Sequence, residues 1–261
     1  MNYGLYLSAS GVLTNMYRQD VFSNNLANSQ TVGYKPDVPA VRPREPESIE
    51  EGFGFELRQK LLDRLGGGVF AGRQSINFSA GRVEPTGNNL DVALKQSDRF
   101  FAVGVTDPET RQRLVHLTRD GRFTTDSDGF LAMVNGGHQV LDANDEPIQP
   151  GAGSLEIDAA GRLVRNGEVL GQIQVATVSD MDVLRKRGGN LFRVEGPDRL
   201  RRTVENPAVM PGFVERSGTD PIKELMKLIA ATKAVTGNGN LIRYHDSMLD
   251  RAVNVLGRVV A

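Results

Sequence analysis

Apolar residues near the start of the chain recur with alternating four- and three-residue spacing. They are Leu5, Ala9, Val12, Met16 and, after a polar gap at Gln19 and Ser23, Leu26. This spacing places them on one narrow side of a helix, and so narrow a seam predicts a second helix packed against it. The helix should end between Asn28 and Gly33, where polar residues and glycine replace the apolar periodicity.

A second periodic stretch, near the C-terminus, carries apolar residues at an unbroken interval of seven: Leu228, Val235, Ile242, Leu249 and Leu256. The positions three further on mix small, polar and apolar residues: Ala231, Asn238, His245, Ala252 and Val259. Such a mixture specifies a coiled-coil interface loosely. We expect two terminal helices that form a coiled-coil-like domain, paired with each other or with neighbouring subunits. Two amphipathic helices on one globular core are the competing interpretation, which explains the polar interruptions less well.

The C-terminal helix should begin after one of three polar residues, Ser217, Thr219 or Asp220. Pro221 suits the first turn of a helix. Gly237 and Gly239 each cost about 1 kcal/mol relative to alanine within a helix. Because the seven-residue register continues across both glycines, we expect one continuous helix.

The segment after the first helix has a different pattern. From Lys35 to Glu47 a proline recurs every three or four residues, which predicts an extended segment. Residues Ser48 to Leu65 have a helical apolar face and predict a short helix, followed by a hinge at Gly66 to Gly68. A phosphate-binding loop at these glycines is disfavoured, because no lysine and serine or threonine follow at the required spacing.

The middle of the chain consists of short β segments separated by turn residues. The predicted strands are Phe100 to Val105, Arg113 to Thr118, Arg122 to Thr125, Phe130 to Val134, Leu155 to Ile157, Leu163 to Arg165 and Gln172 to Val178. Asp-Gly and Asn-Gly pairs between them offer the positive φ angles of tight hairpins. The fold class predicted is therefore α+β, with an all-β central domain between N- and C-terminal helices.

We expect four segments: an N-terminal helical segment at 1–34, an extended linker with a short helix and a glycine hinge at 35–72, a β-rich domain at 73–214, and a C-terminal helical segment at 215–261 that pairs with the first.

Composition narrows the classes of function. The 31 basic and 32 acidic residues nearly cancel and neither sign forms a block, which disfavours nucleic acid as a partner. The chain contains no cysteine or tryptophan, so disulfides, thiolate nucleophiles and cysteine-ligated zinc are excluded. No stretch is long and apolar enough to span a membrane, and no conventional cleaved signal peptide is expected.

Candidate catalytic and metal-binding groups are few. The histidines His116, His138 and His245 are isolated in sequence, and no G-x-S-x-G motif occurs. Asp126 to Gly129 faintly resembles a calcium loop but lacks its later ligands, so a hairpin turn is favoured. We therefore expect no catalytic residue, no cofactor and no metal site.

Two further charged stretches have simpler interpretations than a binding site. The carboxylates of Asp142, Asp145 and Glu146 favour a solvated loop over an acid pair. The basic run Arg185 to Arg187 favours a charged β-edge or loop over a phosphate site.

One motif set carries a family resemblance. The N-terminal stretch resembles the signature of bacterial flagellar rod and hook axial proteins, at Ser10, Gly11, Asn24, Asn25, Leu26, Ala27, Asn28, Thr31, Gly33 and Tyr34. Three further stretches resemble blocks of the same family in the same order: Thr86 to Val103, Leu117 to Leu131 and Pro211 to Ile229. The chain departs from the family pattern at Thr232 to Thr236, at Gly218 and at Lys95 to Arg99.

The resemblance implies a noncatalytic subunit of the flagellar basal-body rod that assembles through its terminal helices into an axial tube and transmits torque. The partners it implies are further copies, other rod and hook subunits, and the flagellar type III export apparatus, with export to the periplasm-spanning rod without signal cleavage. The short segment before the β domain favours the proximal over the distal rod. The assembly interface expected comprises Leu5, Ala9, Val12, Met16, Asn24, Asn25, Leu26, Asn28, Leu228, Val235, Ile242, Leu249 and Leu256.

A different class remains open at this point: a secreted β-rich binding module on a trimeric coiled-coil stalk. Its helical ends would pair stably in the isolated chain. The ends of a rod subunit should instead stay largely disordered in a dilute monomer, because neighbours are needed to satisfy their seams.

Overall fold

The computed structural model describes residues 3–45, 67–107, 112–151, 153–196, 201–205 and 207–256. The chain forms two compact units. A helical unit contains residues 1–27, 37–75 and 220–261, and a β unit contains residues 28–36 and 76–219. Each unit is therefore built from segments that are distant in sequence.

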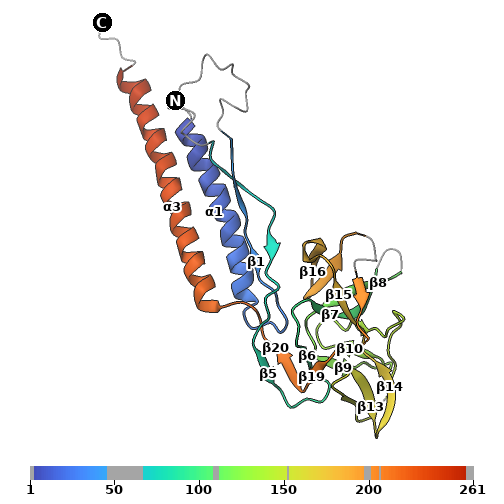
Figure 1. Ribbon diagram of the computed structural model, residues 1–261. Helices are drawn as coiled ribbons and strands as arrows, with labels where there is room; N and C mark the ends of the chain where they lie inside the picture. Colours follow the sequence, from blue (N-terminus) through green and yellow to red (C-terminus); the bar gives the residue numbers. More distant parts are fainter. Residues whose placement is uncertain are drawn as a thin grey trace. The chain divides into compact units, whose positions relative to one another are not determined.

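Two long helices dominate the helical unit. Helix α1 (Tyr3–Ala27) and helix α3 (Pro221–Arg251) lie side by side (Figure 1), and α3 continues into a short π-helical stretch, η4 (Ala252–Leu256). The carboxylate of Asp220 caps α3 by accepting hydrogen bonds from the backbone N–H groups of Ile222 and Lys223. The predicted end of the first helix, the predicted start of the last one and its continuity across two glycines are confirmed.

Short strands accompany α1 in the same unit. Strands β1 (Asp37–Val38) and β4 (Ser75–Ile76) pair, as do β2 (Val41–Pro43) and β3 (Val69–Ala71). The hydroxyls of Thr14 and Tyr17 donate to the carbonyls of Val69 and Gly72, each at 3.3 Å, and so attach α1 to the strand layer. The extended backbone predicted from the prolines is confirmed at β1 and β2. The helix predicted for Ser48 to Leu65 lies outside the described residues, and the hinge at Gly66 to Gly68 stays a prediction.

The β unit is organised around one antiparallel sheet. Within the described residues this sheet has nine strands. Seven follow the order β16 (Leu184–Gly188), β17 (Leu191–Val194), β8 (Arg113–Thr118), β7 (Arg99–Thr106), β11 (Gln139–Val140), β10 (Leu131–Met133) and β9 (Phe123–Thr125), while β15 (Val175–Val178) pairs with β7 and with β18 (Arg201–Thr203). A short 3-10 helix, η2 (Met181–Val183), precedes β16.

Smaller strand groups complete this unit. They are β12 (Glu156–Ile157), β13 (Arg162–Arg165) and β14 (Glu168–Gln172) in one sheet, β5 (Val83–Pro85) with β20 (Phe213–Glu215), and β6 (Val92–Leu94) with β19 (Val209–Pro211). The last two pairs join strands from the beginning of the β unit to strands from its end.

The core lies on both faces of β7. Phe101 and Val103 enter one apolar cluster, whereas Phe100 and Ala102 enter a second cluster on the opposite face. Alternate side chains of a strand point to opposite faces, so a strand covered on both sides needs a continuous apolar run. The uninterrupted run from Phe100 to Val103 meets this requirement.

The α+β fold class is confirmed, and each predicted strand overlaps an observed one, although Gln172 to Val178 spans the end of β14, a break of two residues, and β15. The turn interpretation of Asp126 to Gly129 is also confirmed, because this segment joins β9 to β10 and Asp126 Oδ1 accepts from the backbone N–H of Phe130 at 2.7 Å. The basic run Arg185 to Arg187 lies in β16, at the edge of the large sheet. Coiled-coil geometry of the terminal helices stays a prediction.

His116 on β8 makes the stability of the β unit depend on pH. Its side chain is buried, and burial lowers its pKa, with a further lowering from the charges of Arg187 and Arg193. Below the unfolded pKa of about 6.5, the unfolded chain binds a proton that the folded chain does not. We predict that the free energy of unfolding falls as the pH drops from about 6.5 through the lowered folded pKa of His116.

Urea unfolding at several pH values checks this prediction. In the His116→Gln variant the fall in unfolding free energy between about pH 7 and pH 5 should be smaller than in the unaltered chain. Equal pH dependence in the two proteins would contradict it. The pKa of His138 is also lowered by burial, so some pH dependence should persist in the variant.

Candidate functional site

The terminal helices form the first part of the site, and they run antiparallel. Gln19 on α1 donates to the hydroxyl of Thr232 on α3 at 2.7 Å, while Gly4 lies against His245, further along α3. As the residue number rises along α1, the residue number of the neighbouring position on α3 falls. The two terminal helices therefore pack against each other within a single chain.

The residues expected at the assembly interface fall into groups by exposure. Leu5, Ala9, Val12, Leu26, Asn28, Leu228, Val235, Ile242 and Leu249 are partly buried, Asn25 is buried, and Met16 and Asn24 are exposed. Leu256 lies in η4, and its side chain is outside the described residues. Their role between subunits stays a prediction.

Two glycines of α1 give room to the polar seam residues of α3. A β-carbon on Gly4 would lie 2.7 Å from Nε2 of His245, and one on Gly11 would lie 2.7 Å from Nδ2 of Asn238. Real β-carbons do not approach side-chain atoms so closely, so a larger residue at either glycine would displace the polar side chain opposite it. The polar positions that seemed to specify the seam loosely therefore have matched partners.

Asn25 joins three elements of the helical unit. Its side-chain amide donates to the carbonyl of Asp37 at 2.8 Å and to Oε2 of Glu224 at 3.3 Å, and its Oδ1 accepts from the backbone N–H of Asp37 at 2.9 Å. Glu224 also pairs with Lys227 at 2.6 Å. This buried amide thus links α1, β1 and the first turns of α3, because it satisfies backbone and side-chain groups at once.

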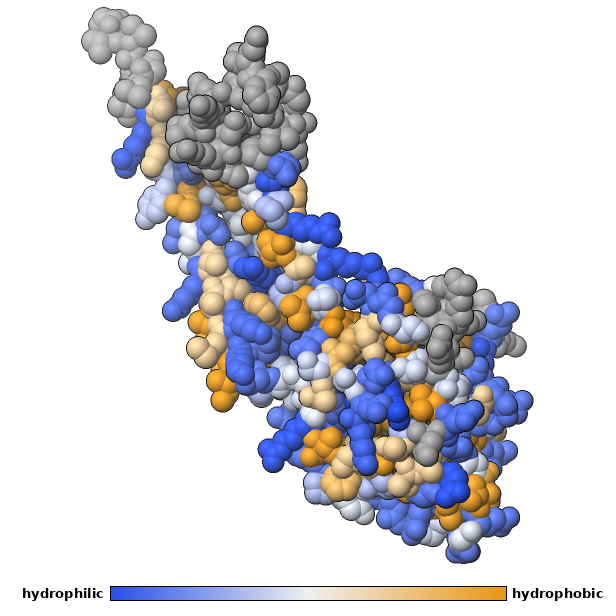
Figure 2. Space-filling view, in the orientation of Figure 1, coloured by the Kyte–Doolittle hydropathy of each residue, from blue (hydrophilic) through white to orange (hydrophobic). Residues whose placement is uncertain are grey.

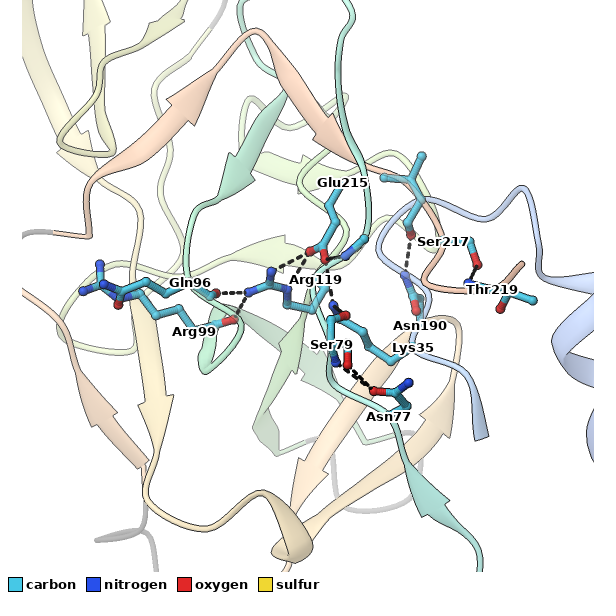
Figure 3. Close-up of polar contacts among 12 residues, drawn as sticks. Lys35, Asn77, Ser79, Gln96, Arg99, Arg119, Asn190, Glu215, Ser217 and Thr219 are labelled. Atoms are coloured by element: carbon cyan, nitrogen blue, oxygen red, sulfur yellow. Dashed lines mark hydrogen bonds and ion pairs between the residues drawn. The ribbon is translucent and has the colours of Figure 1, made fainter. Parts of the chain in front are cut away.

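The second part of the site is an ionic cluster in the β unit, in which the carboxylate of Glu215 lies between two cations (Figure 3). Lys35 Nζ is 2.7 Å from Oε1, and Arg119 Nη2 is 2.6 Å from Oε2. Arg119 Nε makes the better-aligned hydrogen bond to Oε2, at 2.8 Å. The three side chains are at most 2% exposed, so this cluster is isolated from solvent.

The cluster has more positive than negative charge, and backbone groups complete it. Lys35 donates to the carbonyl of Ser79 at 2.8 Å, and Arg119 donates to the carbonyls of Gln96 and Arg99 (Figure 3). The backbone N–H of Gly81 donates to Oε1 of Glu215 at 2.6 Å. Burial lowers the pKa of Lys35, and the charge of Glu215 opposes this lowering. A buried charge is tolerated only with such partners.

Glycines allow the chain segments of the cluster to approach one another. Gly33 has a φ of 70°, and a β-carbon there would lie 2.5 Å from the carbonyl carbon of Arg119. Its N–H donates to the carbonyl of Glu215 at 2.7 Å. At Gly121 a β-carbon would lie 1.7 Å from the carbonyl oxygen of Val92. Four family-like stretches that are distant in sequence therefore converge here.

Sequence reasoning did not identify Lys35, Arg119 or Glu215 as site residues. All three lie in or directly beside the stretches that carry the family resemblance, and each is a charged residue flanked by apolar, glycine or turn residues. That context was a signal, but it did not indicate which charges would meet.

The arrangement suits structure rather than chemistry. Among the described residues, no group of three or more histidine, cysteine, aspartate or glutamate side chains could hold a metal ion. None of the described helices combines the length and apolar character needed to cross a membrane. The ionic cluster is closed and paired, and joins the segment after α1 to the segment before α3.

Loss of the Glu215 charge should strongly lower the stability of the folded chain. We predict that Glu215→Gln lowers the free energy of unfolding by about 3–5 kcal/mol, because two buried cations lose their carboxylate. The matched control is Glu84→Gln on the adjacent strand β5, where the carboxylate pairs at the surface with Arg216. This control should change stability far less than Glu215→Gln does, because solvent screens a surface ion pair. Urea unfolding of both variants measures the difference, and equal losses would contradict the prediction.

Comparison with known proteins agrees with these features at both ends of the chain. The family model described as flagella basal body rod protein matches residues 5–35. The model described as flagellar basal body rod FlgEFG protein C-terminal matches residues 210–255. These regions contain α1, the cluster residues Lys35 and Glu215, and α3.

Named relatives match over nearly the whole length. Flagellar basal-body rod protein FlgF of Rhizobium meliloti is 29% identical, with 98% of this chain and 99% of the relative covered. FlgF of Caulobacter vibrioides is 27% identical, with 99% and 100% covered. Flagellar basal-body rod protein FlgG of Bacillus subtilis is 28% identical, with 96% and 98% covered. The family resemblance seen in the sequence is confirmed: the chain is similar to flagellar basal-body rod proteins over nearly its whole length.

Proposed function

We propose that this protein is a subunit of the flagellar rod that assembles along the axis through its helical unit and transmits torque. One observation carries the proposal: large apolar side chains remain exposed on α1, α3 and η4 after α1 and α3 have packed together. They are Tyr6, Leu13, Met16, Ile222, Leu225, Met226, Ile229, Leu241, Tyr244, Met248 and Val253.

These side chains are 46–72% exposed, and Figure 2 shows apolar surface among polar residues along the helices. Isolated apolar residues are common on protein surfaces, but a long series on two adjacent helices indicates a surface that another molecule covers. Neighbouring subunits would bury it. The partly buried seam residues then hold α1 to α3 within one subunit.

Torque transmission follows from the same arrangement. Many helix pairs in lateral contact resist twisting together, whereas a single joint would not. The partners proposed are further copies and other axial subunits, and a relative named flagellar hook-basal body complex protein in Bacillus subtilis, 23% identical, supports this choice.

We favour the proximal over the distal rod. The support is the short segment between the first helix and the β-rich region. Export through the type III apparatus without signal cleavage is part of the proposal and rests on the family resemblance.

Limited trypsin digestion of the dilute purified chain distinguishes a rod subunit from the stalked binding module. A rod subunit should lose both ends quickly and leave a fragment near Arg73 to Arg216, because its helices need neighbours for stability. Mass spectrometry identifies the surviving fragment. A chain that resists digestion throughout would favour the trimeric stalk instead, since α1 and α3 would then be stable without partners.

Isolated basal bodies test the location and the export route together. The chain should be recovered from the rod with the intact mass of its full translated sequence, and an antibody label should mark the membrane-proximal part. Labelling confined to the distal part would contradict the proximal assignment. A shortened N-terminus would contradict export without cleavage.

A further inference from the structure

A groove in the helical unit is lined by α1, by the segment after β1 and by α3. Its volume is about 470 Å³. Phe22, Val38, Ala230 and Ala234 supply apolar walls, and the small alanines leave the space open. A concave apolar surface of this size fits side chains from another molecule.

The groove also carries two cations with different surroundings. Lys227 already pairs with Glu224 at 2.6 Å and lies over the ring of Phe22. Arg18 has no ion pair with any residue that the structure describes. The groove therefore suits an occupant with apolar side chains and one carboxylate that can reach Arg18.

The outer side of α1 presents this combination of groups. Leu13 is 68% exposed, Met16 is 48% exposed, and Asp20 is also exposed. Spacings of three and four residues place the three side chains on one side of the helix. Asp20, like Arg18, forms no ion pair with another described residue.

Arg18 and Asp20 point in opposite directions from α1. Two residues correspond to roughly 200° of rotation and about 3 Å of rise in an α-helix. The guanidinium of Arg18 and the carboxylate of Asp20 therefore lie at nearly the same position along the axis of α1. Copies placed side by side in the same orientation could join these surfaces without a large shift along the helix axis.

We propose that the groove binds the outer side of α1 from a second copy of this chain. Met16 of that copy packs against Ala234, and its Asp20 pairs with Arg18. The two surfaces differ, so the contact is head-to-tail and can repeat into an open assembly rather than close as a twofold dimer. This inference rests on the proposed function and names one lateral contact of the assembly.

Exchange of the two charges tests the contact in the full-length chain. Arg18→Glu makes both surfaces negative, and Asp20→Arg makes both positive. Each variant alone should self-associate about tenfold more weakly than the unaltered chain, because like charges then face each other. An equimolar mixture should recover to within about twofold, since every contact then joins opposite charges.

Sedimentation velocity measures the association. The control is Asp246→Arg, an exposed carboxylate change on α3 that should leave association unchanged. Circular dichroism and urea unfolding verify that each variant is folded. Single variants that associate normally, or a mixture that does not recover, would overturn the contact while leaving assembly itself intact. No self-association by the unaltered chain at any concentration would overturn both the contact and the proposed function.

Disulfide trapping gives an independent measurement, because the chain has no cysteine of its own. Met16→Cys chains mixed with Ala234→Cys chains should form mixed disulfide dimers under oxidation. Met16→Cys chains alone should not form dimers efficiently. Dimers of one variant alone, or trapping in cells only to a different protein, would overturn the assignment of a second copy to the groove.

Discussion

The β unit depends on the carboxylate of Glu215 at the place where the chain enters and leaves this unit. It is buried between Lys35 and Arg119, and the backbone of its own residue also accepts from Gly33. These contacts join the segment that enters the β unit, a turn in the middle of the chain and the strand that leaves the unit. Buried charges are costly when unpaired, so the cluster has few alternative arrangements. The cluster fixes the relative positions of these three segments more sharply than hydrophobic packing alone would.

In the helical unit, two helices pack together although polar residues interrupt the apolar seam of each. Gly4 and Gly11 provide space for His245 and Asn238, and Asn25 completes the end of the interface nearest the start of α3. Polar residues in a helical interface usually reduce stability while they specify register. Here the matched glycines make one register sterically possible for each polar side chain. The inner surface is thereby satisfied within the chain, and the apolar residues that remain exposed lie on other sides of the helices.

Local patterns in the sequence predicted most of the fold. Helix ends followed from Asp220 and from the polar residues after Leu26, and the longer strands followed from apolar runs between turn residues. The short pairs β5–β20 and β6–β19 were not predicted, because each strand has only three residues and its partner is far away in the sequence. The ionic cluster was missed for a related reason. Lys35, Arg119 and Glu215 are far apart in sequence, and the attraction between charges leaves no local pattern from which their meeting could be inferred.

The antiparallel pairs β5–β20 and β6–β19, together with the bond from Gly33 to Glu215, bring the beginning and end of the β unit together. An insert whose two ends are adjacent imposes little geometric demand on the domain that carries it. The β unit can therefore vary in length or be exchanged during evolution while the helices keep their sequence and register. In the proposed assembly, subunits with different β units can then share one kind of axial connection, which allows a continuous filament to be built from several diverged genes.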